Sequence, residues 1–533
     1  MEVPYLYISL FLLLASYLFT THFRSKSANL PPTVFPVLPI IGHLYLLKLP
    51  LYRTLAKIST KYGPVLLLRF GFRRVLLISS PSAAEECFTT NDIIFANRPR
   101  LLFGKIIGNN YTSFGWASYG EHWRNLRRIA SLEILSTRRI NEFYDARVDE
   151  GRLLIRKLMS NSSPTRGIFC RRYEFIFIFI TEASYIIYKL IRYSSTVNLR
   201  SVFYELTLNM MMKMISGKRY FGGDIPALEE EGERFREMMD ETFLLSGAAN
   251  VGDYLPVCSW LGVKRLEKKL IVLQEKLDSF FQRLIEQLRT SKEEMKNTKK
   301  TMIEVLLSLQ ESDPEYYTDQ IIRSFVQVLI FAGTDTSSGT MEWSLSLLLN
   351  HPQVLRKAQN EIDRKIGNDR LVEESDIVDL PYLRGILNET LRLYPTVPLL
   401  VPHESSRDCI IEGYNVPRGT MLLVNQWAIH HDPKLWTDPE RFNPERFEEL
   451  GGTRDGFKLM PFGSGRRGCP GEGLAVRMIG LTLGLLIQCF DWERLSDNMI
   501  DMKEGLGVTM PKAEPLVAMC KPRLEMQDVV AQL

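Results

Sequence analysis

One cysteine of the chain lies in a sequence context that would allow it to ligate a metal. Cys469 lies in the stretch PFGSGRRGCPG, residues 461–471, which is rich enough in glycine for the backbone to approach a flat ligand. Arg466 and Arg467 precede it and an apolar helical pattern follows Pro470, so cations and a helix N-terminus are both expected to favour the thiolate. Such a thiolate could be the axial ligand of an iron porphyrin; a buried structural cysteine in a glycine turn is the alternative. Unusual backbone dihedrals are expected at Gly463, Gly465, Gly468 and Gly471.

A long apolar helical pattern carries polar residues at its centre. It predicts a helix over residues 318–349, with AGTDTS, residues 332–337, in the middle. The small residues Ala332 and Gly333 would let a flat group lie against the helix, and Asp335 and Thr336 could relay protons beside it. Polar residues cost stability at such a position, so a proton-relay groove is favoured over a transmembrane helix with a polar defect or a kink.

A glutamate and two arginines could form a buried network. Glu389 and Arg392 are spaced i,i+3 and share one helix face, which alone would indicate an ordinary surface salt bridge. Arg446, in FNPERF, offers a second guanidinium. The three side chains could lock one helix onto the loop that precedes the cysteine.

Four residues could bind carboxylates of a ligand. Trp123 and Arg127 are spaced i,i+4, so an indole N–H and a guanidinium lie on one helix face. Arg467 is a third candidate. His403 is a weaker fourth, since an ordinary histidine at a strand end explains it almost as well.

The loop around Cys469 resembles the haem-binding signature of the cytochrome P450 family. The residues on matching positions are Phe462, Gly465, Arg467, Cys469 and Gly471. This resemblance implies haem b, with iron ligated by Cys469 and the loop residues Phe462 and Gly463 beside it. It further implies an acid–alcohol pair for proton delivery at Asp335 and Thr336. The Glu-Arg-Arg core would have a structural role, and the haem propionates would be held by Trp123, Arg127, Arg467 and His403.

A narrower resemblance is to plant A-type microsomal members of that family. LPIIGHL, NHPQVLRKAQNEID, WAIHHDPKLWTDPERFNPERF and GEGLAVR look like the group of isoflavone hydroxylases, indole glucosinolate hydroxylases and lignan methylenedioxy-bridge enzymes. This implies a monooxygenase that inserts one atom of O2 into a hydrophobic, aromatic secondary metabolite, with electrons from NADPH–cytochrome P450 reductase. Substrate contacts are expected from residues 99–119, 325–333, 396–402 and 505–510. Reductase docking is expected at a basic face of Arg124, Arg128, Lys458 and Arg466, for which ordinary solvated charge is an equal alternative.

Other functions stay open at this point. A haem-thiolate isomerase or dehydratase would need neither O2 nor a reductase, and the acid–alcohol pair argues against it. Some bridge-forming members depart from the alcohol at the position of Thr336, so hydroxylation is favoured over bridge formation. An inactive haem-binding membrane protein would result if an unusual segment prevented folding. Nucleic-acid binding is not expected from a net charge of +4, and the seven cysteines lack the paired spacing of a zinc site or a disulfide framework.

The N-terminal residues are expected to be a membrane anchor. The uncharged run from Val3 to Thr21 is long enough to span most of a bilayer core, and the following Arg24 and Lys26 place the rest of the chain in the cytosol. Residues 24–42 are a basic, proline-rich hinge that would orient the next domain. Membrane lipid is therefore an expected partner, with a single pass through the endoplasmic reticulum membrane by resemblance.

The remainder, residues 43–533, is expected to be one catalytic domain. Its pattern predicts a mainly α protein with small β-sheets, and the resemblance implies the cytochrome P450 fold preceded by one transmembrane helix. Residues 164–195 do not fit, because they interrupt two consecutive helices, 138–159 and 199–216, with a run rich in Ile, Phe, Tyr and Arg. A translated intron is the favoured interpretation, ahead of a surface insertion or a second membrane-contacting element.

Overall fold

The structure is a computed structural model that describes residue 16 and residues 28–162, 195–223, 225–246, 250–255, 263–291, 300–448 and 456–532. The predicted anchor, apart from Ser16, therefore lies outside the described residues, as do residues 24–27 of the hinge and all but the last residue of the segment 164–195.

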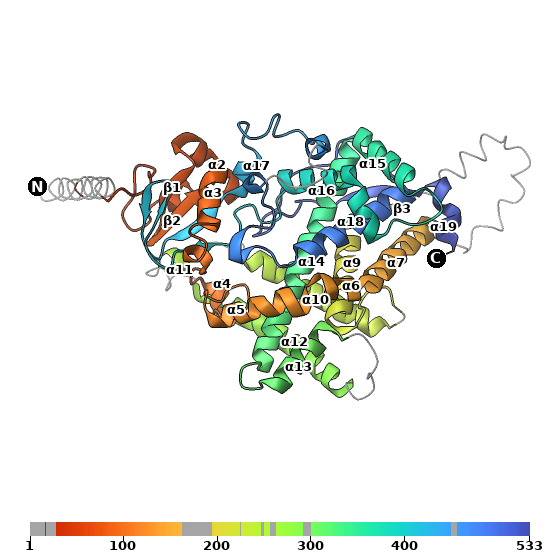
Figure 1. Ribbon diagram of the computed structural model, residues 1–533, viewed down its shortest axis with the longest axis horizontal. Helices are drawn as coiled ribbons and strands as arrows, with labels where there is room; N and C mark the ends of the chain where they lie inside the picture. The colour runs from red at the N-terminus through yellow and green to blue at the C-terminus, as the bar shows by residue number, and fades with distance from the viewer. Residues whose placement is uncertain are drawn as a thin grey trace, which may run out of the picture.

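Helices make up most of the described chain, as predicted (Figure 1). The helices are α2 (Leu51–Tyr62), α3 (Pro81–Phe88), α4 (Leu102–Ile106), α5 (Glu121–Arg128), α6 (Thr137–Glu142), α7 (Tyr144–Ser162), α9 (Leu199–Ser216), α10 (Pro226–Ser246), α11 (Val251–Tyr254), α12 (Val263–Ser291), α13 (Met302–Ser312), α14 (Asp319–Asn350), α15 (Pro352–Lys365), α16 (Pro381–Leu393), α17 (Gln426–His430), α18 (Glu472–Cys489) and α19 (Gln527–Ala531). The predicted helix 138–159 is two helices, α6 and α7, because the α6 backbone ends at Phe143.

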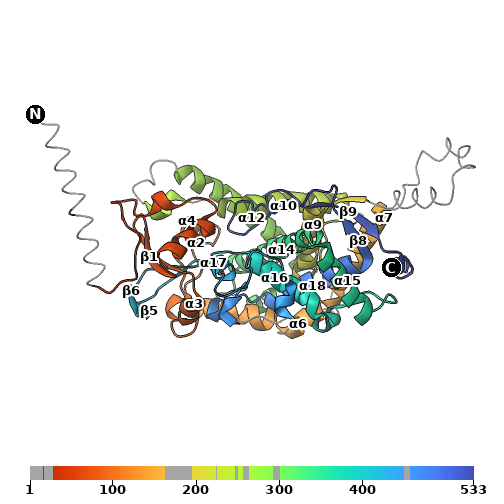
Figure 2. The same ribbon diagram turned by 90° about the horizontal axis from the view of Figure 1, so that it is seen from above.

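The strands form small sheets at the two ends of the molecule (Figure 2). One sheet has the order β1-β2-β7-β4, a second β3-β9-β8, and β5 pairs with β6. The predicted hairpin is present: β1 and β2 are antiparallel, and Gly71 in the turn has φ +57°, where glycine is favoured. The strand bounds are β1 Val65–Phe70, β2 Arg73–Ile78, β3 Ser195–Asn198, β4 His403–Glu404, β5 Cys409–Ile411, β6 Tyr414–Val416, β7 Met421–Val424, β8 Phe490–Glu493 and β9 Val517–Pro522.

The long helix α14 runs through the middle of the molecule, with α9, α16 and α18 packed against it (Figure 1). Thr318 caps its N-terminus by accepting a hydrogen bond from the Ile321 N–H, and the helix ends at Asn350, within one residue of the predicted bounds. Among the described helices, α18 alone is long and apolar enough to cross a membrane, and most of it is buried in the core. Helices α14, α16 and α18 thus form the framework that positions the site residues.

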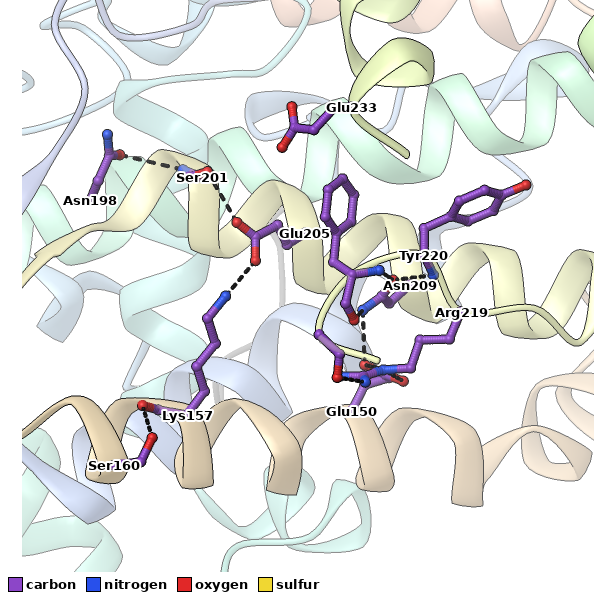
Figure 3. Close-up of polar contacts among 12 residues, drawn as sticks. Glu150, Lys157, Ser160, Asn198, Ser201, Glu205, Asn209, Arg219, Tyr220 and Glu233 are labelled. Atoms are coloured by element: carbon purple, nitrogen blue, oxygen red, sulfur yellow. Dashed lines mark hydrogen bonds and ion pairs between the residues drawn. The ribbon is translucent and has the colours of Figure 1, made fainter. Parts of the chain in front are cut away.

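Helices α7 and α9, on either side of residues 163–194, are joined by contacts of their own (Figure 3). Glu150 of α7 is buried, and it pairs with Arg219 at 2.9 Å and with Lys213 of α9 at 2.9 Å. Lys157 of α7 pairs with Glu205 of α9 at 2.6 Å. The adjoining strand β3 pairs with β9 and lies beside α7. These ion pairs therefore join the two helices directly.

Candidate active site

The cysteine loop has the backbone shape of a close ligand support. Gly463 and Gly465 each have φ +67°, and a Cβ at Gly465 would lie 2.5 Å from the Asp92 carboxylate. The Cys469 N–H donates to the Phe462 carbonyl at 2.8 Å, and the loop leads directly into α18. The prediction of unusual dihedrals was wrong for Gly468, at φ −53°, and for Gly471, at φ −91°.

Cys469 is an exposed residue of the loop, but the protein around it partly removes its sulfur from water. Burial raises the pKa of Cys469, which the Gly471 N–H and the Arg127 guanidinium only partly oppose. The expectation that the loop itself favours a thiolate was therefore wrong. A coordinated metal ion would remove the proton outright, so the thiolate state is tied to metal binding.

The two arginines of the loop do not act on the sulfur as predicted. Arg467 turns toward the backbone, where it donates to the Ala96 carbonyl at 2.7 Å and to the Ala117 carbonyl. Arg466 pairs with Asp92 at 3.4 Å. The cation that does influence Cys469 is Arg127, which comes from α5 and donates to the Gly468 carbonyl at 2.6 Å.

Arg467 belongs to a cluster of three guanidinium groups. Burial, together with the charges of the nearby Arg98 and Arg127, lowers the pKa of Arg467 to about 8. Burial lowers the pKa of Arg98 to about 9. Within the described residues, none of the three forms an ion pair with an acid. Buried cations without counter-charges are costly, so this cluster indicates an anionic ligand.

Trp123 points to the same ligand. Its side chain is 3% exposed, and its Nε1–H has no hydrogen-bond partner within the described part of the chain. The Arg467 guanidinium lies over the Trp123 ring, 4.2 Å from its centroid. An unsatisfied indole donor beside three arginines matches the carboxylates of a haem b, and Cys469 would supply a thiolate ligand for its iron. The donor set therefore fits haem.

Arg98 was missed by sequence reasoning. It donates to the Gly115 carbonyl at 3.2 Å and to the carbonyls of Val401 and Pro402 at 2.8 Å each, so it ties together two of the expected substrate segments. It stands alone in FANRPR with no partner at helical spacing, and no sequence pattern marks it as buried.

His403 contacts the backbone of a neighbouring segment, and its role toward a propionate remains a prediction. It is buried, and its Nδ1 lies 2.8 Å from the Phe95 carbonyl, which can only accept, so Nδ1 carries the proton. Burial lowers the pKa of His403 well below its usual value, and the Arg98 charge lowers it further. The neutral ring then has no proton on Nε2.

The acid Asp335 and the alcohol Thr336 lie in the middle of α14. Ala332 is exposed between buried stretches of the helix, and Gly333, Asp335 and Thr336 are partly exposed on the turns beside it. The Thr336 hydroxyl donates to the Ala332 carbonyl at 2.5 Å, one turn back. Burial raises the pKa of Asp335 to about 6, although a hydrogen bond from the Thr509 hydroxyl opposes this. Asp335 is thus an acid that exchanges protons near neutral pH.

The structure brings the Glu-Arg-Arg residues together. Glu389 and Arg392 are both fully buried and form a two-bond pair at 2.7 and 2.8 Å. Arg446 donates to the same carboxylate at 3.2 Å, and so does the Asn443 N–H at 3.0 Å. A second buried pair, Arg147 with Glu374, was not predicted and joins α7 to residues 374–379.

The remaining expected surfaces are also located. Phe114 and Phe325, from two of the expected substrate segments, lie 5.7 Å apart between ring centroids, and Phe114 stacks on Trp123. The four cations of the expected docking face, Arg124, Arg128, Lys458 and Arg466, are all exposed. Arg466 is engaged with Asp92, so only part of its charge is available to a partner.

Comparisons with known proteins agree with this geometry. The family model described as Cytochrome P450 matches residues 32–519. Cytochrome P450 81Q32 of Catharanthus roseus is 49% identical over 95% of this chain and 94% of its own length. The isoflavone 2'-hydroxylase of Glycyrrhiza echinata is 48% identical over 98% of each chain, and the (+)-piperitol/(+)-sesamin synthase CYP81Q2 of Sesamum radiatum is 46% identical over 100% and 99%.

A solved structure supports the fold. A zebra fish cytochrome P450 with progesterone superimposes with a TM-score of 0.72, covering 89% of this chain and 100% of that chain at 24% identity. The mainly helical fold and the cysteine-ligated haem implied by the loop are those of that family. With the family model spanning most of the sequence and relatives near half identity over their full length, the chain belongs to the cytochrome P450 family.

Proposed function

We propose that this protein is a membrane-anchored monooxygenase that inserts one atom of O2 into a hydrophobic, aromatic plant secondary metabolite. The electrons come from NADPH through a cytochrome P450 reductase. The observation that carries the proposal is the acid–alcohol pair on α14, where Asp335 has a pKa of about 6 beside the Thr336 hydroxyl. An isomerase or dehydratase has no use for proton delivery of this kind.

The protein's own part in the reaction is to bind, orient and deliver protons. Haem, when bound, supplies the reductive activation of O2. Trp123, Arg98, Arg127 and Arg467 would hold its carboxylates, and Cys469 would hold its iron. Asp335 takes up and releases protons near neutral pH, and the Thr336 hydroxyl, which now donates within its own helix, can turn to accept and pass on a proton.

Aromatic side chains support an aromatic substrate. Phe114 and Phe325 meet across two of the proposed substrate segments, and such faces stack with flat rings. The relatives include isoflavone hydroxylases and a lignan-forming synthase, so flavonoids and lignans are the first compounds to test. Methylenedioxy-bridge formation is the second candidate, favoured by the 46% identity to the sesamin synthase; the Thr336 hydroxyl favours hydroxylation.

The anchor and the domain bounds are part of the same proposal. Residues 1–23 would span the endoplasmic reticulum membrane once, residues 24–42 would be the hinge, and residues 43–533 would be the cytosolic catalytic domain. Large apolar side chains near the hinge support this, because Phe35, Ile40 and Leu49 are 58%, 63% and 68% exposed. Alkaline carbonate extraction of microsomes should leave the full chain in the pellet and release a chain that begins at residue 24.

The function is tested in two steps. The reduced carbon monoxide difference spectrum of microsomes should show the thiolate-shifted band, and Cys469→Ser should abolish it. Cys409→Ser, at a partly buried cysteine of β5, is the control and should keep the band. NADPH-dependent incorporation of labelled O2 into a flavonoid or lignan, in the presence of reductase, then separates a monooxygenase from an isomerase. A normal thiolate band in Cys469→Ser would refute the ligand assignment.

A further inference from the structure

Trp343 of α14 joins two distant segments to the helix that carries Asp335 and Thr336. It lies about two turns beyond Thr336 on that helix. We infer that Trp343 is a positioning residue for substrate specificity, because its indole N–H holds residues 505–510, and through them residues 396–402, at a fixed place beside the helix. This inference rests on the proposed monooxygenase function, in which both segments contact the substrate.

The indole of Trp343 is held in one orientation. Its side chain is 2% exposed, and its Nε1–H donates to the Met510 carbonyl at 2.8 Å. The ring stacks on Tyr394, which follows the end of α16, with 3.9 Å between the centroids and 9° between the planes. The Lys512 Nζ lies over the same indole, 4.8 Å from its centroid. The direction of the N–H is therefore set by ring contacts on α16 and on the C-terminal part of the chain.

The Met510 backbone joins the two segments to each other. Its N–H donates to the Thr396 carbonyl at 2.9 Å, while its carbonyl accepts from Trp343. The Thr396 hydroxyl also lies 3.3 Å from the hydroxyl of Thr340, which precedes Trp343 by about one turn of α14. Both segments are thus attached to one short stretch of that helix.

The residue next to Trp343 holds the chain that follows Met510. Glu342 is buried; its carboxylate accepts from the Leu516 N–H at 2.8 Å and pairs with Arg200 of α9 at 3.1 Å. These contacts fix the chain beyond residues 505–510, whereas the Trp343 hydrogen bond acts on Met510, the last residue of the segment itself. A substitution at Trp343 can therefore shift the segment while the chain after it stays attached.

Loss of the indole N–H leaves the buried Met510 carbonyl without this donor, which is costly for a carbonyl removed from water. The two segments are then expected to shift relative to Asp335 and Thr336. A bulky ligand that contacts the segments should respond to this shift more strongly than a small one.

The test compares Trp343→Phe, which keeps an aromatic ring without the N–H, with Trp492→Phe. Trp492 is the matched control, because it is also buried and its Nε1–H donates to a backbone carbonyl, that of Leu486, at 2.9 Å. Imidazole, as a small ligand, and phenylimidazole, as a bulky one, are titrated into the holoenzyme. We expect the ratio of their dissociation constants to change by about 2- to 10-fold in Trp343→Phe, the equivalent of one hydrogen bond, and to stay unchanged in Trp492→Phe. With reductase and NADPH, the proportions of the hydroxylated products of the isoflavone genistein should change in Trp343→Phe only.

Hydrogen exchange adds a measurement that depends neither on a ligand nor on turnover. The Met510 amide should exchange about 2- to 10-fold faster in Trp343→Phe than in the wild type or in Trp492→Phe. If Trp343→Phe yields no haem-loaded protein, Thr340→Val takes its place. That variant removes the hydroxyl beside Thr396 and should also move the ligand ratio away from the wild-type value.

An unchanged ligand ratio in haem-loaded Trp343→Phe, or in Thr340→Val where it takes its place, would overturn the inference. Faster exchange without a change in that ratio would show that Trp343 serves folding alone. If the wild type oxygenates no substrate, the proposed function fails, while the ligand ratio and the exchange rate still decide whether Trp343 positions the two segments.

Discussion

At the residue scale, a substitution at Trp123 tests haem binding separately from folding. Its Nε1–H has no partner within the described residues, so Trp123→Phe removes a donor that the protein itself does not use. A hydrogen bond to a charged carboxylate contributes roughly 1.5–3 kcal/mol, and its loss should speed haem release by about 10-fold or more. Transfer of haem to an excess of apomyoglobin measures this rate.

A matched tryptophan provides the control for that measurement. Trp492 is also buried, but its Nε1 donates to the Leu486 carbonyl at 2.9 Å. Trp492→Phe should lower the melting temperature and leave the rate of haem release nearly unchanged. Equal release rates in the two variants would show that Trp123 does not bind a propionate.

Asp335 is a second residue whose substitution should change a measurable property, here the stability of the protein. The pKa of Asp335 is raised to about 6, so ionisation above that pH disfavours the folded state, while at about pH 2.5 the carboxyl is protonated in both states. Asp335→Asn should therefore raise the free energy of unfolding at pH 7.5 by on the order of 1–3 kcal/mol and leave it nearly unchanged at about pH 2.5. Urea unfolding at both pH values checks this. The same variant should lose most of its oxygenation, because Asn cannot exchange the proton.

At the element scale, α16 depends on one fully buried carboxylate. Glu389 receives hydrogen bonds from Arg392, Arg446 and the Asn443 N–H, so Glu389→Gln leaves two guanidinium groups without a counter-charge. Breaking a buried pair costs roughly 3–5 kcal/mol, enough to prevent recovery of haem-loaded protein in microsomes. The exposed pair Arg234–Glu230 is the control, and Glu230→Gln should leave the carbon monoxide band intact.

At the same scale, individual helices show how much of the fold could be predicted from the sequence. Helices α14, α16 and α18 were predictable because their apolar periodicity is local, and Glu389 with Arg392 are one turn apart. Arg98 was not recognised, because its partners come from segments far away in the sequence and nothing local marks its burial. The pKa of Cys469 was misjudged for a related reason, since Arg467 is adjacent in sequence but bonds to distant carbonyls.

At the scale of the whole molecule, the elements on either side of residues 163–194 are joined by contacts between described residues. The ion pair Lys157–Glu205 joins α7 to α9 (Figure 3). A second pair, Glu150–Lys213, joins the same helices, and β3 is paired along its length with β9. These contacts come from residues on either side of the segment. A chain in which residues 163–194 are replaced by a short Gly-Ser linker should therefore still fold around haem.

That replacement is the last prediction, and it bears on whether the segment belongs to the native protein. The shortened chain should give a thiolate-shifted carbon monoxide band at least as strong as the full chain, because the aggregation-prone run EFIFIFI is removed and no described contact is lost. A Gly-Ser segment of equal length controls for spacing, and loss of the band in both replacements would show that the segment is needed for folding. Transcripts that lack the coding sequence for this segment would identify it as a retained intron, whereas tryptic peptides from Tyr173 to Lys189 in the native protein would exclude that origin.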